Sequence, residues 1–434
     1  MNAFAGDSLL EFLDNSPCNF FAVDTIKKTL VNSGFSELKP ENQWILEKGG
    51  KYFVTKNDTA IFAFVIGNKP LCDTGFNIIS AHSDSPCFRI KPNPEMLVDG
   101  VLKLNTEVYG GPILYTWFDR PLSIAGRVLV RNEKNPGQPI TKLFDFGEPV
   151  LIIPHLAIHF NRNVNEGNPL SKQVDMLPVC AIVNETAEKN NFLLNKLKEK
   201  LGLTDISEIL DFDLMLYNSQ KAQLTGFNHE FVCSGRIDDL SMAHAAMCGL
   251  LNSSNESTTK IMAIFDNEET GSGTKQGAAS PVLSNIMRRI ALCMGLNEEG
   301  FYRTIARSFL VSADNAHAIH PNYVNKYDPT NHPQMGKGPV IKINANCKYM
   351  TDAHSSAVFK EVCRLADVPC QYFVNHSDVA GGSTLGNIFT AQVDVDGVDM
   401  GNPIWSMHSA METGALADQD YAIRAFTTFY DLVR

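Results

Sequence analysis

The stretch "IMAIFDNEETGSG", residues 261–273, combines an apolar run with a dense acidic group. The apolar run is typical of a buried strand and ends at Phe265. Three carboxylates follow within the next four residues, at Asp266, Glu268 and Glu269. Like charges this close repel one another, and burial strengthens the repulsion because the effective dielectric constant falls. The stretch therefore predicts a strand end that is either open to water or occupied by positive charge.

The composition is that of an ordinary globular protein, with 44% hydrophobic and 20% charged residues in a chain of 434, long enough for two domains. The net charge of -11 argues against nucleic acid and anionic membranes as partners, because both need a basic face. The N-terminal stretch lacks the basic region of a signal peptide, and no apolar run approaches the roughly 18 residues of a membrane span. Ten scattered cysteines without a C-x-x-C motif indicate free, mostly buried thiols. We therefore expect a cytoplasmic protein.

Strand and helix patterns alternate along much of the chain. Apolar runs bounded by turn residues predict buried strands at 59–67, 76–82, 260–266 and 308–314. Helical spacing predicts one helix that ends near Gly34, and others at 239–251, 277–293, 352–366 and 415–432. This alternation predicts an α/β fold whose sheet carries helices on both faces.

Residues 95–232 follow a different pattern. They contain short β-type runs such as "SIAGRVLV" (123–130) and "PVLIIPHLAIHF" (149–160), separated by proline, glycine and asparagine. One helical part, at 186–200, is charged. We therefore predict an inserted second domain at 95–232, between the two parts of a first domain at 1–94 and 233–434.

Two pairs of polar residues flank predicted elements. His82 and Asp84 come directly after a predicted strand, where the first could bind a metal and the second could orient it. Taken alone, this pair also fits a surface turn. Asp238 and Asp239 directly precede a predicted helix, where aspartate is a good N-cap. Neither pair is decisive without the rest of the pattern.

Further polar residues beside predicted strands and helices are also candidate metal ligands. Asp314 follows another apolar strand with His317 three residues on, and His408 and Glu412 precede the last helix. The carboxyl ends of strands are where open α/β sheets build their sites. Histidine and carboxylate ligands without cysteine suit zinc, cobalt or manganese, and their number exceeds the needs of one tetrahedral ion. We therefore expect two metal ions, about 3.5–4 Å apart, that activate water and polarise a carbonyl, with one carboxylate left over to move a proton.

The motifs resemble those of the aspartyl aminopeptidase family of two-metal exopeptidases, in a bacterial-type member. They run in order over nearly the whole chain and include "SAHSDSPCFRIKP", "GRIDDL", "DNEETGSGTKQGA", "SADNAHAIHPNY", "SDVAGGSTLG" and "MHSAMETGA". The resemblance implies a three-layer αβα catalytic domain of the two-zinc aminopeptidase type, with an inserted, mainly β dimerisation domain. It also implies dimers that assemble into a tetrahedral dodecamer.

The resemblance implies specific metal ligands. His82 and Asp314 would hold one ion, and Glu269 and His408 the other. Asp238 would bridge the two ions, which are expected to be zinc, with cobalt or manganese as alternatives. The enzyme would then remove the N-terminal residue from peptides with a free N-terminus.

The resemblance also assigns roles in catalysis and substrate binding. Glu268 would be the general base and acid, and Asp84 would orient His82. Four residues would contact the substrate: His159, His317, Lys342 and Tyr349. Lys342 suits an acidic N-terminal residue. Related peptidases further imply a cis peptide bond between the two aspartates of "GRIDDL".

Two departures from the family pattern bear on specificity. Met411 stands where many relatives have arginine, which removes a cation near His408 and leaves the preference for acidic residues open. Thr270 replaces a common valine, and neither change removes a ligand or the base. The alternatives are another two-metal amidohydrolase, such as a deacylase or carboxypeptidase, and a non-catalytic shell or cargo protein. A spare carboxylate at Glu268 argues against a scaffold, and a pocket for a substrate carboxylate would favour the carboxypeptidase.

Overall fold

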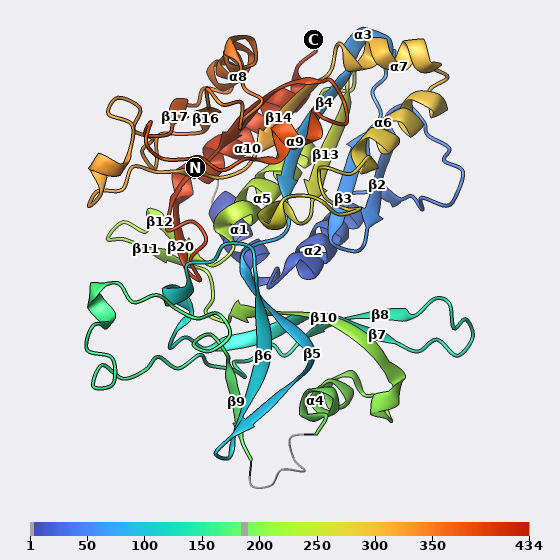
Figure 1. Ribbon diagram of the computed structural model, residues 1–434. Coiled ribbons are helices and arrows are strands. Elements are labelled where there is room, and N and C mark those ends of the chain that lie inside the picture. Colours follow the sequence, from blue (N-terminus) through green and yellow to red (C-terminus); the bar gives the residue numbers. More distant parts are fainter. Residues whose placement is uncertain (1–3, 184–189, 434) are drawn as a thin grey trace. The chain divides into compact units, whose positions relative to one another are not determined.

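The computed structural model describes residues 4–183 and 190–433 and divides into two compact units (Figure 1). The first unit consists of the chain up to Asp84, Ala222–Met407 and the chain from Glu412. The second consists of Ser85–Lys221 and His408–Met411. The predicted site residues are therefore divided between the units, because His159 and His408 belong to the second.

A mixed sheet of nine strands forms the centre of the first unit. Its order is β1 (Ser36–Glu37), β2 (Lys51–Lys56), β3 (Ala60–Val65), β13 (Thr259–Phe265), β4 (Phe76–His82), β14 (Phe309–Ala313), β18 (Asp396–Gly401), β16 (Val340–Ile343) and β17 (Gln371–Val374). The neighbours β13, β4, β14 and β18 are parallel. Strands β3 and β16 run antiparallel to β13 and β18 respectively. The four strands predicted from apolar runs are β3, β4, β13 and β14, so this part of the prediction is confirmed.

Alternate residues of the central strands enter two separate cores. Met262 and Ile264 of β13 pack in a core with α1 (Phe4–Asp14), α2 (Asn19–Asn32), α5 (Ile237–Asn252), α8 (Ala353–Leu365) and α10 (Leu416–Asp431). Ile261, Ala263 and Phe265 pack in the other, with α3 (Leu71–Thr74), α6 (Val282–Cys293), α7 (Glu298–Ile305) and α9 (Leu385–Phe389). Both faces of β13 are therefore buried, which explains its unbroken apolar sequence. The predicted α/β fold with helices on both faces is confirmed.

A small sheet that the sequence did not predict completes the first unit. Its five strands are β11 (Gln223–Thr225), β12 (Phe231–Ser234), β20 (Glu412–Ala415), β19 (Pro403–Trp405) and β15 (Ala316–His317), in that order. Asp238 and His408 follow β12 and β19 of this small sheet. These two candidates therefore follow strands of the small sheet and not of the central sheet.

The second unit is built on an antiparallel sheet of six strands. Their order is β8 (Ile140–Asp145), β7 (Leu122–Val130), β10 (Ile209–Asn218), β5 (Cys87–Val98), β6 (Val101–Tyr109) and β9 (Val179–Ile182). The predicted run at 123–130 is β7. The run at 149–160 contains only isolated bridges at residues 151–153, so its prediction as strand is wrong, and Pro154 helps to end the pairing because it has no N–H to donate.

Helix boundaries differ from prediction at two places. The helix predicted at 277–293 begins at Val282, directly after Pro281, which is favourable at a helix start but not inside one. The helix predicted at 186–200 is α4 (Phe192–Leu201), and residues 186–189 of that prediction lie outside the described residues.

Candidate metal centre

Three parallel strands bring several of the predicted residues to one edge of the central sheet. His82 is the last residue of β4, which pairs in parallel with both β13 and β14. Glu268 and Glu269 begin the turn after β13, and Asp314 directly follows β14. Because the carboxyl ends of parallel strands meet at the same edge, these side chains converge although they are far apart in the sequence.

The innermost group consists of four buried residues. The ligand atoms of His82, Asp238, Asp239 and Asp314 all lie within 4.8 Å of one another. His82 Nε2 lies 3.8 Å from Asp238 Oδ1 and 3.9 Å from Asp239 Oδ2. His82 also forms such a group with Glu268 and Glu269. Nitrogen and oxygen atoms spaced in this way can bind a zinc-like ion.

The electrostatics of the group indicate that it needs a cation. Burial, together with Asp314 and Glu269, raises the pKa of Glu268 to about 9 although His82 opposes the shift. Burial also raises the pKa of Asp239 and Asp314, and nearby carboxylates add to both shifts. The protein alone therefore disfavours the fully anionic cluster. A divalent cation would stabilise these carboxylates as anions, so the donor set fits the metal that its residue types predict.

Asp84 joins the histidine to the acidic turn. His82 Nδ1 lies 3.0 Å from the backbone oxygen of Asp84 and 3.4 Å from one of its carboxylate oxygens. The backbone N–H groups of Glu268 and Glu269 each donate to this carboxylate, both at 3.1 Å. A single buried side chain therefore contacts the ring of one candidate ligand and holds the backbone of two others.

The remaining acidic residue of the opening stretch supports the turn. Asp266 is buried and accepts hydrogen bonds from Asn19 Nδ2 at 3.0 Å and from the backbone N–H of Asn267 at 2.8 Å. Gln276 Nε2 donates to Asn267 Oδ1 at 2.9 Å, which ties the turn to the following loop. The three carboxylates are therefore not equivalent, because Glu268 and Glu269 form with His82 a group that could hold a metal ion, and Asp266 supports the turn.

Sequence reasoning assigned no ligand role to Asp239, but its carboxylate lies in the group with His82, Asp238 and Asp314 that could hold a metal ion. Its two oxygens accept from the backbone N–H groups of His82 at 3.1 Å and Asn315 at 3.3 Å, so it also ties together the ends of β4 and β14. Both aspartates have non-helical backbone angles at the start of α5, and the Asp239 carboxylate accepts from His82 and Asn315, which lie outside that helix. The peptide bond between Asp238 and Asp239 is cis, which confirms that prediction.

A buried lysine lies next to the acidic group. Lys342 Nζ lies 3.3 Å from Asp314 Oδ1 and 5.7 Å from the centroid of the Tyr349 ring. Burial alone would lower the pKa of this lysine, but Asp314, Tyr349 and Asp399 outweigh it and raise the pKa. Lys342 therefore stays positively charged beside the candidate ligands.

The other predicted substrate residues are more exposed. His317 ends β15, and its ring packs edge-on against Phe373 at 5.7 Å between centroids. In the second unit, His159 is exposed in a turn.

His408, a predicted metal ligand, belongs to that same unit. Its Nδ1 lies 3.1 Å from the backbone oxygen of Gly111.

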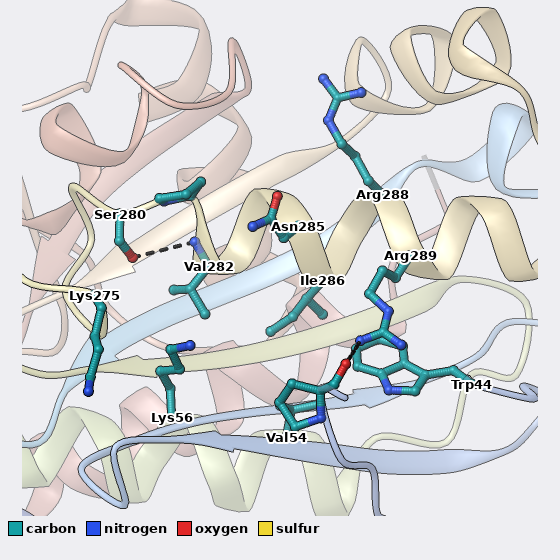
Figure 2. A pocket seen from close by; sticks show the side chains of 12 residues that line it. Trp44, Val54, Lys56, Lys275, Ser280, Val282, Asn285, Ile286, Arg288 and Arg289 are labelled. Carbon is teal, nitrogen blue, oxygen red and sulfur yellow. Dashed lines mark hydrogen bonds between the residues drawn. The ribbon is translucent and has the colours of Figure 1, made fainter. Parts of the chain in front are cut away.

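A cavity of about 500 Å³ in the first unit is separate from this group. Figure 2 shows its lining, in which Arg289 stacks on Trp44 at 3.7 Å and the helix start near Ser280 faces Lys56 and Lys275. The described residues that line it include none of the predicted site residues. The candidate site is therefore the buried acidic group and not this cavity.

Comparison with known proteins now decides the family. The model of the family described as "Aminopeptidase I zinc metalloprotease (M18)" matches residues 12–430. The chain belongs to the M18 family of aminopeptidases. It is 51% identical over 427 residues to a probable M18 family aminopeptidase 2 of Clostridium novyi (strain NT), with 98% of each chain covered. A protein of the same description from Pseudomonas aeruginosa (strain UCBPP-PA14) is 40% identical over 432 residues, with 99% of each covered.

Solved structures of M18 aminopeptidases share the fold. The match to a chain in the cryo-EM structure of the Ape4 and Nbr1 complex has a TM-score of 0.94 and 38% identity, covering 98% of this chain and 85% of that one. For mApe1 of Chaetomium thermophilum the TM-score is 0.89 at 30% identity, covering 99% and 97%. The protein is therefore an M18 metallo-aminopeptidase, a hydrolase that removes N-terminal residues from peptides. Among the described residues of this aminopeptidase, no helix is both long and apolar enough to cross a membrane.

Proposed function

We propose that His82 and Asp314 hold one zinc ion, that Glu269 and His408 hold a second, and that Asp238 bridges them. The observation that carries this proposal is the convergence of His82, Asp238 and Asp314 within 4.8 Å in a buried, acidic setting. Cobalt or manganese would suit the same nitrogen and oxygen donors. When bound, the metals supply Lewis acidity, which lowers the pKa of water toward about 7 and polarises a peptide carbonyl.

We infer that Glu268 moves the proton. Its carboxyl group is next to His82 and Glu269 in a metal-binding group, so it is close to the metals without being needed as a ligand. Glu268 accepts the proton of the attacking water and passes it to the leaving amine. The backbone bond from Glu268 to Asp84 fixes the start of this turn, and Asp84 also orients the ring of His82.

The substrate is proposed to bind through four further residues. The acidic cluster attracts the free α-amino group of the peptide. His159 and His317 stabilise the negative charge that develops on the carbonyl oxygen. Lys342 and Tyr349 line the pocket for the N-terminal side chain, and the charge of Lys342 favours aspartate or glutamate there. The ion pair of Lys342 with Asp314 limits this preference, because the substrate must share the lysine.

A panel of aminoacyl chromogenic substrates, measured after reloading with zinc, cobalt or manganese, tests this proposal. We expect the highest kcat/KM for aspartyl and glutamyl substrates, and no cleavage when the α-amino group is acetylated. Lys342→Met should reduce kcat/KM for acidic substrates about tenfold more than for leucyl substrates. Lys260→Met is a matched control, because Lys260 is also buried and lies 3.6 Å from an aspartate, Asp431, in a strand–helix contact. Release of acetate from the acetylated substrates, without release of the chromophore, would favour the deacylase alternative.

We also propose that the second unit forms a dimer and that dimers assemble into a tetrahedral dodecamer. Several large apolar side chains near His159 are exposed, including Leu156, Ile158 and Phe160, the last of them 82% exposed. Exposed apolar groups clustered in this way are typical of interaction sites. The similar mApe1 of S. cerevisiae is described as a dodecamer. Light scattering should give about twelve times the 47.9 kDa of one chain, and Phe160→Asp should lower that mass. A fully active monomer would contradict the assembly.

A further inference from the structure

A buried carboxylate that the proposed mechanism does not use lies in the central sheet. Asp399 is on β18 and is 0% exposed. Its Oδ1 accepts from the hydroxyl of Thr384 and its Oδ2 from the backbone N–H of Met350, both at 2.6 Å. These short hydrogen bonds come from neutral donors. Burying a charge in this way is costly, so the bonds it makes are expected to serve a purpose.

The two partners belong to different loops. Met350 lies between β16 and α8 and directly follows Tyr349. Thr384 lies between β17 and α9 and is the N-cap of α9. The backbone of Asp399 adds a second link to the first loop, because its N–H donates to Thr351 Oγ1 at 2.9 Å. One residue of the sheet therefore holds residues 350–351 and residue 384 together.

The packing around this contact leaves little room for another arrangement. A Cβ atom added at Gly386 would lie 2.7 Å from Asp399 Oδ1. One added at Gly397 would lie 2.5 Å from the terminal methyl carbon of Met350. Both distances are far shorter than a normal contact. The methyl carbon of Met350 ends a flexible side chain and could move, so Gly386 is the position where glycine allows close packing onto Asp399.

We propose that Asp399 is a positioning residue of the substrate pocket, which clamps the loop of Tyr349 against the loop of Thr384 and thereby sets substrate affinity. Tyr349 is one residue from the clamped Met350, and its ring lies 5.7 Å from Lys342 Nζ. Release of the loop would move the ring away from the lysine without touching His82, Asp238 or Glu268. The inference rests on the proposed role of Lys342 and Tyr349 in the pocket.

The clamp is tested with zinc-loaded enzyme and aspartyl p-nitroanilide. Thr384→Val and Asp399→Ala each remove clamp hydrogen bonds and should raise KM about tenfold, with kcat within about threefold of wild type. Asp399→Asn should keep KM within about threefold, because the amide can still accept from Met350 and can donate to the rotatable hydroxyl of Thr384. Thr304→Val is the matched control, since Thr304 is buried and donates its hydroxyl to Gly300 O at 2.8 Å within α7.

The possible outcomes separate positioning from mere stability and from a wrong pocket. Suppose that Thr384→Val and Asp399→Ala lower the melting temperature as Thr304→Val does but leave KM unchanged. Asp399 would then be only structural, and the proposal would be overturned. Thr384→Val decides the question if Asp399→Ala does not fold. If Tyr349→Ala also leaves KM unchanged, the pocket assignment itself has failed. If Tyr349→Ala raises KM but the clamp variants do not, only the clamp is refuted.

Discussion

Two sites in the same central sheet bury carboxylates in opposite ways. At the carboxyl ends of β4, β13 and β14, several carboxylates surround His82, and crowding with burial raises the pKa of Glu268 to about 9. On β18, Asp399 is fully buried, but hydrogen bonds from Thr384, Ser312 and Met350, together with the charge of Lys342, oppose the rise in pKa that burial causes. A single buried carboxylate can therefore be held by hydrogen-bond donors and one nearby lysine. Several crowded carboxylates disfavour their common anionic form, and a bound cation would relieve this repulsion.

Replacing a carboxylate by its amide should change kcat very differently at the two sites. Glu268→Gln should lower kcat about 10²–10⁴-fold, because the amide cannot carry the proton. Asp399→Asn should leave kcat within about threefold, since its role is to accept hydrogen bonds. Steady-state rates on one substrate compare the two, with zinc content per subunit as the control. A Glu268→Gln enzyme within about threefold of wild type would remove Glu268 from proton transfer.

A third buried group in the first unit is a base and not an acid. His244 of α5 is buried, and burial lowers its pKa to about 4. Its ring nitrogens lie 2.9 Å from Ser8 Oγ and 3.0 Å from Gln419 Nε2, and Cys248 Sγ lies 3.5 Å from Nε2. Among the described residues, these hydrogen-bond partners include no carboxylate. The ring is therefore expected to be neutral in the folded protein at neutral pH.

This lowered pKa predicts a dependence of stability on pH. The unfolded chain binds a proton at His244 below about pH 6.5, while the folded chain does so only below about pH 4. The stability conferred by the neutral ring is thus complete above about pH 6.5 and is lost as the pH falls toward about 4, by at most roughly 3 kcal/mol. In urea unfolding at several pH values, the free energy of unfolding of His244→Gln should fall less over this pH range than that of wild type. An equal dependence of the unfolding free energy on pH in both proteins would mean that the His244 ring is already protonated or that other groups determine this dependence.

The parts of the fold that could be predicted from the sequence are those with a strong local signal. β4 and β13 were predictable because both faces are buried, which leaves an unbroken apolar run. The small sheet was missed because β15 has 2 residues and β19 has 3, too few to show any periodicity. Such strands are specified by their neighbours and not by their own sequence.

Some residues of the candidate site could likewise be predicted from the sequence, and others could not. His82, Glu269 and Asp314 follow recognisable strands, so their residue types and positions indicated a metal site. Asp239 was hidden in an aspartate pair that also fits a helix cap. The one available signal for Asp399 is an acidic residue within the apolar stretch "GVDMG", and its partners Met350 and Thr384 are remote in the sequence. Contacts of that kind come from the tertiary fold.

Anomalous diffraction at the zinc edge, from crystals grown with zinc, tests most directly whether the acidic cluster is a two-metal site. We expect two peaks per subunit, both within ligand distance of Asp238, about 2.0–2.2 Å for carboxylate oxygen. His82 and Asp314 should contact one ion, and Glu269 and His408 the other, while Asp399 should contact neither. Absence of any peak near Asp238 in zinc-soaked crystals, or a single ion bound by cysteines elsewhere, would contradict the two-metal assignment.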